Sequence, residues 1–194
     1  MHDPIAQFSE WFAAAKATPA IADATAMTLA TATADGKPAA RVVLLKGHGA
    51  DGFVFYTNFT SRKGTELKAN PQAALCFYWP VLDRQIRIEG RVAPVSDAEA
   101  DAYFASRARE KQIGAWASLQ SQPLPSREAL LTRIAELTKQ HEGQPVPRPP
   151  HWSGWRLVPT RIEFWSQGDF RLHEREVFTR DHAHAPWRHT LLYP

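Results

Sequence analysis

The sequence predicts a mainly β protein with helical additions, built on an antiparallel barrel. Several short segments with strand character are joined by tight turns. Helical segments are inserted between these strands and do not alternate with them regularly. The strands expected at residues 41–46 and 53–57 are too close for the helical crossover that parallel strands need. A parallel βαβ fold is therefore disfavoured.

The chain opens with a predicted helix, followed by three strands. Asp3 and Pro4 are favoured at the N-cap and the first position of a helix, and apolar residues recur at helical spacing over residues 5–15. Turn-forming residues 34–38 close the first strand. The three strands are expected at residues 25–33, 41–46 and 53–57.

The middle of the chain combines a short helix with two different strands. The helix is expected over residues 61–70, because Pro71 stops it. Residues 73–79 are apolar enough for a strand that is buried on both faces. Apolar and polar residues alternate over residues 85–92, which predicts a strand with one buried and one solvated face.

Two more helices and a set of strands complete the pattern. A capping-box sequence at residues 96–99 opens a helix that runs through Phe104. A second helix is expected over residues 126–141. Residues 144–150 are rich in proline and predict an extended connector. The last strands are expected at residues 155–158, 161–165 and 177–180.

Length and composition indicate one globular domain over residues 1–194, with the first helix inside residues 1–20. Hydrophobic residues make up 44% of the chain, and no apolar run is long enough to span a bilayer. The net charge of +3 is too small to indicate a nucleic-acid-binding protein. No secretory signal is visible, and Cys76 is the single cysteine, so we expect a reducing, cytoplasmic setting. The seven Trp and ten Phe residues fit a core, a subunit interface or the walls of a site for a flat ring.

Three motifs give little evidence about function. Residues 47–52 match the letters G-x-G-x-x-G, but a strand follows where dinucleotide binding needs a helix, so we interpret them as a hairpin turn. His182, His184 and His189 lack the spacing of metal ligands, which favours a surface loop over a metal site. Cys76 lies in an apolar run and is interpreted as a buried, inert thiol, not as a nucleophile.

The basic residues are more informative. Arg62 and Lys63 follow Ser61 at the start of a predicted helix, where backbone N–H groups and the helix dipole favour an anion. Arg41 and Lys46 lie in one strand at opposite parity, which places them on opposite faces unless the strand bulges. Two further basic groups are expected, one at a helix end and one on one side of an extended segment. They are Arg107, Arg109 and Lys111, and Arg171, His173 and Arg175. Together these residues suggest a small anionic ligand.

The chain also resembles the pyridoxine/pyridoxamine 5′-phosphate oxidase family. The resemblance runs from Phe8 to Trp187, and its segments occur in the order of the family. The most specific segments are residues 41–46, 55–58, 61–63, 112–116, 120–121, 162–165 and 171–173.

The resemblance implies an FMN-binding split β-barrel, antiparallel and with flanking helices. It implies a homodimer with two flavin sites at the subunit interface, in which residues 142–194 form the dimerisation and active-site segment. The implied reaction oxidises pyridoxamine or pyridoxine 5′-phosphate to pyridoxal 5′-phosphate and passes a hydride equivalent from the substrate C4′ to flavin N5. The electrons then go to O₂ and give H₂O₂. Neither a nucleic acid nor a membrane is an expected partner.

The resemblance assigns roles to individual positions, and it implies no metal ligand. Arg171 and His173 are the expected catalytic residues, which hold the substrate ring against the flavin. The expected substrate-binding residues are Lys46, Tyr103, Arg107, Lys111, Arg171 and His173. The expected FMN-binding residues are Arg41, Val42, Val43, Leu44, Leu45, Lys46, Tyr56, Thr57, Arg62, Lys63, Gln85, Gln120, Ser121, Trp165 and Arg175.

Three departures from the family pattern bear on the substrate. Lys111 stands where the family usually has a serine, residues 191–194 lack the usual arginine, and no basic segment precedes the first helix. Two alternatives stay open: a related flavin oxidase of another ring substrate, of the phenazine-pathway type, and a non-catalytic flavin- or pyridoxal-phosphate-binding protein. Retention of Tyr103 and Arg107 favours the B6 substrate, and retention of Arg171 and His173 argues against the non-catalytic reading.

Overall fold

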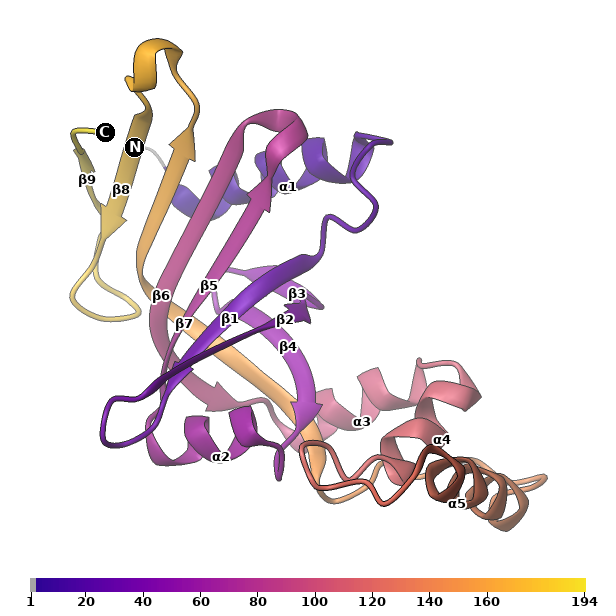
Figure 1. Ribbon diagram of the computed structural model, residues 1–194. Coiled ribbons are helices and arrows are strands. Elements are labelled where there is room, and N and C mark those ends of the chain that lie inside the picture. Colours follow the sequence, from indigo (N-terminus) through magenta and orange to yellow (C-terminus); the bar gives the residue numbers. More distant parts are fainter. Residues whose placement is uncertain (1–2) are drawn as a thin grey trace.

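The computed structural model describes residues 3–194 as one antiparallel sheet, with the first helix packed across it and the other helices gathered at one end (Figure 1). The strands are β1 (Ala26–Ala32), β2 (Pro38–Leu44), β3 (Gly47–Gly49), β4 (Gly52–Asn58), β5 (Gln72–Trp79), β6 (Arg84–Pro94), β7 (Trp152–Ser166), β8 (Glu174–Thr179) and β9 (Arg188–Leu191). The helices are α1 (Pro4–Ala17), α2 (Arg62–Ala69), α3 (Asp97–Ala105), α4 (Arg109–Ala117) and α5 (Arg127–Gln140). Two 3₁₀ turns cover Pro80–Leu82 and Asp169–Arg171.

The strand order is β2-β1-β5-β6-β7-β4-β3. Outside this order, β8 pairs with β7, and β9 pairs with β8. Neighbouring strands are antiparallel throughout the described residues. The first part of β7 pairs with β4 and its last part pairs with β8. This one long strand therefore connects the β3–β4 hairpin to the β8–β9 hairpin. The register of β6 and β7 shifts at Glu89 and Gly90. A Cβ at Gly90 would lie 2.1 Å from the carbonyl oxygen of Val158, so this close approach requires glycine.

The main core lies inside the curled sheet and is covered by α1 (Figure 1). Asp3 caps α1 by accepting a hydrogen bond from the backbone N–H of Ile5, as predicted. Phe8 of α1 packs edge-on against Phe53 and Phe77, with ring centroids 4.8 and 5.3 Å apart. A smaller apolar cluster around Phe104, Ile113, Val146 and Trp152 joins α3 and α4 to the start of β7.

Most of the predicted elements are confirmed within one or two residues of their expected ends. Ser96 and Ser126 cap α3 and α5 as the sequence indicates. Residues 47–52 form the hairpin of β3 and β4 and not a dinucleotide-binding loop. Gly52 has a φ of +120°, and a Cβ there would lie 2.2 Å from the carbonyl oxygen of Leu157.

Four expectations about local structure are wrong. Strand β5 is not buried on both faces, because Tyr78 is 59% exposed while alternate residues are buried. The two strands expected at residues 155–165 form one strand, β7. Residues 169–171 form a 3₁₀ turn, not an extended chain, with positive φ at Phe170 and Arg171. Arg109 and Lys111 begin the separate helix α4, and no helix ends at them.

No helix among residues 3–194 is long and apolar enough to cross a membrane. The Cys76 thiol is half-buried, and burial raises its pKa, which disfavours the reactive thiolate.

Candidate functional site

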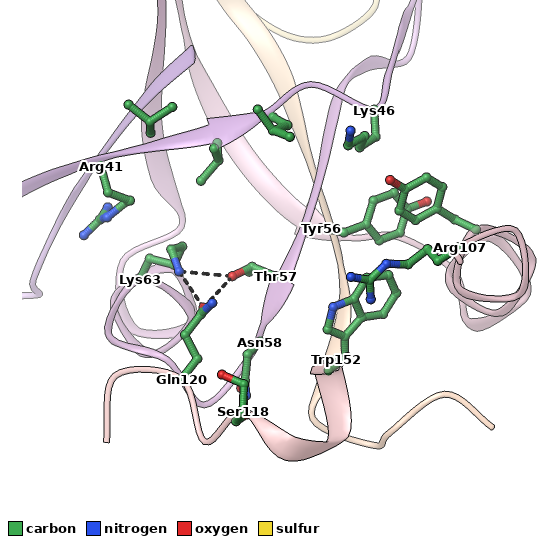
Figure 2. Close-up of a pocket in the computed structure, with 15 residues that line it drawn as sticks. Arg41, Lys46, Tyr56, Thr57, Asn58, Lys63, Arg107, Ser118, Gln120 and Trp152 are labelled. Atoms are coloured by element: carbon green, nitrogen blue, oxygen red, sulfur yellow. Dashed lines mark hydrogen bonds between the residues drawn. The ribbon is translucent and has the colours of Figure 1, made fainter. Parts of the chain in front are cut away.

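A cavity of about 410 Å³ lies between β2 and β4 on one side and α3, α4 and the start of β7 on the other (Figure 2). Four cationic side chains line it, namely Arg41, Lys46, Lys63 and Arg107. No acidic side chain of the described residues lines it. The charge of the walls therefore suits an anionic ligand.

A second cavity of about 480 Å³ adjoins the first, since Arg41, Lys63 and Gln120 line both. Arg62 and Ser121 line this second cavity as well. Together the two cavities bring together most of the residues that the sequence resemblance assigns to a site. These residues are Arg41, Val42, Val43, Leu44, Lys46, Tyr56, Thr57, Arg62, Lys63, Tyr103, Arg107, Gln120 and Ser121.

Arg41 and Lys46 line the same cavity, so the expectation that they face opposite ways is wrong. Strand β2 ends at Leu44, and the parity argument does not extend to Lys46. The backbone N–H of Lys46 donates instead to the carbonyl of Val54 on β4, at 2.8 Å. Leu45 is 3% exposed and belongs to the core. Lys111 is exposed on α4 and does not line either cavity.

One end of the cleft is built on the first turn of α2. Ser61 is the N-cap of this helix, and its hydroxyl accepts a hydrogen bond from the backbone N–H of Gly64. The ammonium of Lys63 donates to Thr57 Oγ1 at 3.2 Å and to Gln120 Oε1 at 2.7 Å (Figure 2). Burial, and next the charge of Arg41, lowers the pKa of Lys63. A lysine with a lowered pKa gains from an anion that enters the cleft.

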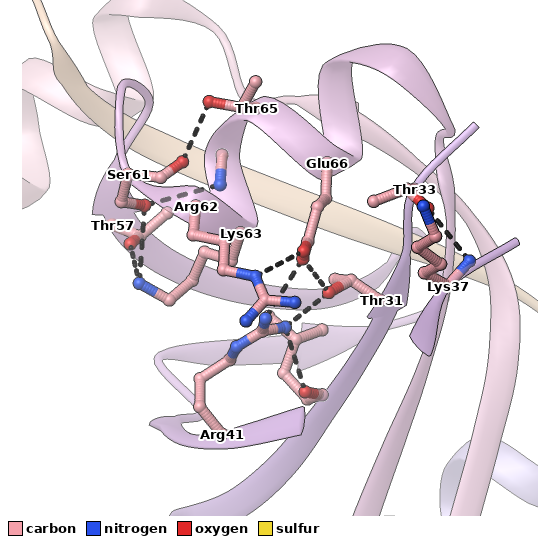
Figure 3. Close-up of polar contacts among 12 residues, drawn as sticks. Thr31, Thr33, Lys37, Arg41, Thr57, Ser61, Arg62, Lys63, Thr65 and Glu66 are labelled. Atoms are coloured by element: carbon pink, nitrogen blue, oxygen red, sulfur yellow. Dashed lines mark hydrogen bonds and ion pairs between the residues drawn. The ribbon is translucent and has the colours of Figure 1, made fainter. Parts of the chain in front are cut away.

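The same end contains a carboxylate that the sequence resemblance did not single out. Glu66 accepts hydrogen bonds from Arg41 Nη2 at 3.0 Å and from Arg62 Nε at 2.9 Å (Figure 3). Burial alone would raise the pKa of Glu66, but hydrogen bonds from Thr31, Arg62 and Arg41 outweigh burial and lower it. Only the spacing of Arg62 and Glu66, four residues apart on a helix, hints at this contact in the sequence.

The other end of the cleft has aromatic walls. The rings of Tyr56, Tyr103 and Trp152 are nearly parallel, with the Tyr56 centroid 4.0 Å from Tyr103 and 5.2 Å from Trp152. The guanidinium of Arg107 lies 4.8 Å from the centroid of Trp152 (Figure 2). Burial, followed by the charge of Glu99, raises the pKa of Tyr56 to about 12. Trp152 also lines the cavity, and the sequence reasoning did not single it out.

Arg107 has a buried donor that is left unpaired within the described residues. Its Nη1 atom is buried and has no hydrogen-bond partner among the described residues. Burial lowers the pKa of this guanidinium. A buried guanidinium nitrogen without an acceptor costs free energy, which an anion in the cavity would recover.

The remaining predicted site residues lie elsewhere, at the end of the sheet away from α2 to α5 (Figure 1). Gln85, Trp165 and Arg175 are neighbours across β6, β7 and β8. His173 lies beside Trp165, with ring centroids 4.8 Å apart, and Arg171 is exposed in the 3₁₀ turn. None of these five residues lines either cavity described above.

Arg175 is held on this face by a second buried carboxylate. Its Nε and Nη2 atoms donate to Glu163 Oε1 at 2.9 and 2.8 Å, and its Nη1 donates to the carbonyl of Tyr193 at 3.0 Å. Phe170 and Tyr193 are each 94% exposed, and Leu172 is 68% exposed. Large apolar side chains left open in this way are typical of a protein–protein interface.

Fold and cleft together define an antiparallel barrel protein with a cationic cleft for a ligand that carries anionic groups. Comparisons with known proteins make this class specific. Residues 13–141 match the family model described as pyridoxamine 5′-phosphate oxidase. Residues 152–194 match the model described as the pyridoxine 5′-phosphate oxidase C-terminal dimerisation region.

Similar proteins agree with the family models. The chain is 60% identical over 192 residues to a pyridoxine/pyridoxamine 5′-phosphate oxidase of Myxococcus xanthus, covering 99% of this chain and 92% of that protein. It is also 60% identical to the enzyme of that name from Sphingopyxis alaskensis, covering 99% of this chain and 88% of the relative. The chain therefore belongs to the pyridoxine/pyridoxamine 5′-phosphate oxidase family, a family of oxidoreductases, and the resemblance noted from its sequence is confirmed.

Solved structures confirm the predicted split barrel. PhzG from Burkholderia lata, in complex with tetrahydrophenazine-1-carboxylic acid, superposes with a TM-score of 0.92 at 36% identity, covering 99% of this chain and 93% of that one. An FMN-binding protein from Nostoc punctiforme, related to pyridoxamine 5′-phosphate oxidase, has the same fold at a TM-score of 0.78 and 17% identity, with full coverage of both chains.

Proposed function

We propose that this protein is an FMN-dependent oxidase that converts pyridoxamine 5′-phosphate and pyridoxine 5′-phosphate to pyridoxal 5′-phosphate. Oxygen is the electron acceptor and is reduced to H₂O₂; with the amine substrate, water supplies the aldehyde oxygen and ammonia is released. The observation that carries the proposal is one cleft with cations at both ends. Arg41, Arg62 and Lys63 lie at one end, and Lys46 and Arg107 at the other. Two separate phosphate groups, one on the cofactor and one on the substrate, match this arrangement.

The chemistry of the first end fits the phosphate of FMN. Arginine offers a planar fork of N–H donors and lysine a compact point charge, the two donor types that a phosphate accepts best. The backbone N–H groups at the start of α2 add the favourable end of a helix dipole. Arg41, Arg62 and Lys63 would hold the phosphate, while Gln120 and Ser121, which line the same cavity, would contact the polar chain of the cofactor.

The chemistry of the second end fits the substrate phosphate. Lys46, Tyr103 and Arg107 line the cavity together, and the buried Nη1 of Arg107 lacks an acceptor in the described structure. A phosphate oxygen would supply one. Lys111 is exposed one helical turn before Ala115, which lines the cavity. Lys111 would therefore add positive charge near the cavity without lining it.

The remaining half of each site would come from a second copy of the chain. Arg171, His173, Gln85, Trp165 and Arg175 lie away from the cleft of their own subunit. They share their face with exposed apolar side chains, and all of them except Gln85 belong to the segment matched by the dimerisation model. A symmetric homodimer that places this face over the partner's cleft would complete two equal sites.

Bound FMN supplies the two-electron acceptor that this oxidation needs. The protein's own residues have positioning work, because transfer of a hydride equivalent requires the donor carbon to be held at contact distance without a strong base. Lys46 and Arg107 anchor the substrate phosphate. Arg171 and His173 of the other subunit hold the substrate ring.

Purification and a direct assay test this proposal. The purified protein is expected to show a flavin absorption spectrum, and to form pyridoxal 5′-phosphate and peroxide in equal amounts from pyridoxamine 5′-phosphate and O₂. A protein that stays colourless after reconstitution with FMN would contradict the whole proposal. A flavoprotein that binds the B6 phosphates without oxidising them would contradict the assigned reaction.

The similarity to PhzG favours one second candidate, an oxidase of another ring substrate. The ligand named in that structure, tetrahydrophenazine-1-carboxylic acid, has a carboxylate and no phosphate. Competition separates the two candidates. Inorganic phosphate is expected to compete with the substrate at Arg107 if the substrate is a phosphate ester, and Arg107→Ala is expected to abolish that competition.

A further inference from the structure

Glu66 is one of the two buried carboxylates in the part of the chain that the structure describes, the other being Glu163. Its side chain is 5% exposed and projects from the second turn of α2. It lies beside three cations that face the cleft, although it carries the same sign of charge as the proposed ligand. A buried acid next to an anion site requires a physical reason, because burial of charge is costly unless the charge is paired.

Both oxygens of the Glu66 carboxylate accept hydrogen bonds. Glu66 Oε1 accepts from Arg62 Nε, and Oε2 accepts from Arg41 Nη2. The hydroxyl of Thr31, itself 4% exposed, donates to Oε2 and accepts from Arg41 Nη1 (Figure 3). Three elements, β1, β2 and α2, therefore meet at this one carboxylate.

These contacts fix the direction of both guanidinium groups. Each arginine donates one N–H group to Glu66 and keeps other N–H groups available for a ligand. Arg62 uses only Nε, and its two terminal nitrogens have no acceptor among the described residues. Arg62 is 66% exposed, so without Glu66 its long side chain would sample many rotamers in solvent.

The charges also match. Arg41, Arg62 and Lys63 carry three positive charges, and Glu66 removes one of them. The remaining charge of two is close to that needed to balance a phosphate monoester near neutral pH, which carries about −1.5 to −2.

We propose that Glu66 is a positioning residue that orients Arg41 and Arg62 toward the phosphate of the flavin cofactor, and so gives the site its preference for FMN over riboflavin. This inference rests on the proposed function, since it takes the flavin phosphate as the ligand. Glu66 itself does not contact the cofactor and is not a catalytic residue.

Two effects of neutralising Glu66 oppose each other. Removal of a negative charge strengthens the attraction of the site for phosphate, but this effect is screened in a cleft that is open to solvent. Loss of the carboxylate also frees both guanidinium groups, and the amide of a glutamine would point a donor at one of them. Hydrogen bonds to a charged group act at short range and depend on orientation. We therefore expect the loss of orientation to dominate.

The test compares FMN with riboflavin, which lacks the phosphate. The deflavinated full-length protein and its Glu66→Gln variant are titrated with each flavin, and flavin fluorescence gives both dissociation constants. The ratio of the riboflavin constant to the FMN constant measures phosphate recognition. Glu66→Gln is expected to lower this ratio by about tenfold or more and to leave riboflavin binding unchanged.

Two variants serve as controls. Thr31→Val keeps the shape and every charge but removes the hydroxyl between Glu66 and Arg41, and is expected to lower the ratio by about threefold. It also keeps the inference testable if Glu66→Gln does not fold. Glu163→Gln removes the other buried carboxylate, which binds Arg175 away from the cleft. Any effect of this change on flavin binding is expected to be equal for both flavins.

An unchanged ratio in Glu66→Gln and Thr31→Val would overturn the inference and reduce Glu66 to a structural ion pair. An increased ratio would overturn it as well, because Glu66 would then only weaken the attraction for phosphate. If the unmodified protein shows no preference for FMN, the proposed function fails first, so the two failures are distinguishable.

Discussion

Glu66 and Glu163 are both buried and both bind arginines, but Glu66 lies on α2 and Glu163 on β7. Glu66 holds Arg41 and Arg62, which line the cavities of their own subunit. Glu163 holds Arg175, and its other oxygen accepts from Arg161 at 3.1 Å. Neither of these two arginines lines those cavities.

The difference teaches how the proposed site is divided. In both places a carboxylate fixes guanidinium groups from neighbouring elements before any ligand arrives. One cluster serves a cleft that the subunit contains, whereas the other serves a face that the subunit presents outward. Four experiments test this division, beginning with the largest expected effect.

Complementation between subunits tests the division directly. Arg107→Ala damages the cleft and Arg171→Ala damages the outward face, so each homodimer is expected to lose about 100-fold or more in kcat/KM. In a statistical mixture of the two variants, half of the dimers are mixed and each contains one intact site. Activity is therefore expected to return to about a quarter of the unmodified value.

Activity that does not return on mixing would contradict the interface site, provided that subunit exchange is shown by differently tagged chains. A mixture of Arg107→Ala with Lys46→Ala is the matched control. Both changes lie on the same side of the division, so this mixture is expected to stay inactive.

Arg62 and Arg171 are expected to have separable roles. Arg62→Ala removes a proposed ligand of the FMN phosphate and is expected to weaken FMN binding by about tenfold to a hundredfold, with kcat at saturating FMN changed by less than about twofold. Arg171→Ala is expected to do the reverse. Flavin titration and steady-state kinetics on both variants measure the two effects, and equal effects on binding and turnover would refute the assignment.

As pH rises, phosphate recognition is expected to weaken at a lower pH than it would with a lysine of ordinary pKa. The pKa of Lys63 is lowered by burial and by Arg41, and a bound phosphate raises it again. FMN affinity is therefore full below the pKa of Lys63 in the free protein and falls as pH rises through that value, which lies below 10.5. The ratio of riboflavin to FMN dissociation constants, followed against pH, measures this fall. Lys63→Met is expected to remove it, and a fall that persists in Lys63→Met would assign it to another group.

Lys111→Ser is expected to give the smallest effect. The side chain is exposed and does not line the cavities, so its charge acts through solvent. We expect KM for pyridoxamine 5′-phosphate to change by less than about threefold, and the change to shrink as salt is added. A much larger change that is insensitive to salt would show that Lys111 moves into direct contact with the substrate.

Local sequence signals predicted the parts of the fold that depend on local chemistry. Asp3, Ser96 and Ser126 accept hydrogen bonds at the starts of their helices, as their positions indicate. Helix α4 was missed because its N-cap is Ala108, which has no capping side chain, and because Gly114 lies inside it.

Long-range contacts explain the other errors. Two separate strands were expected on either side of residues 159–160, but β7 runs through both, and its register with β6 shifts where Pro159 lies opposite Gly90. The bend at Phe170 and Arg171 depends on left-handed backbone conformations, which these residue types do not predict. Glu66 could not be assigned to the site, because its contacts with Thr31 and Arg41 cross 35 and 25 residues of sequence.

Strand β7 has a consequence for how the enzyme responds to dilution. It carries Trp152 in the cleft at its first residue and Trp165 of the outward face near its last. At a rise of about 3.3 Å per residue, these two tryptophans are roughly 40 Å apart as measured along the strand. No side-chain rotation or loop movement closes such a distance. Under the proposed function a lone subunit has no complete site, so specific activity is expected to fall to zero as the concentration drops below the dimer dissociation constant.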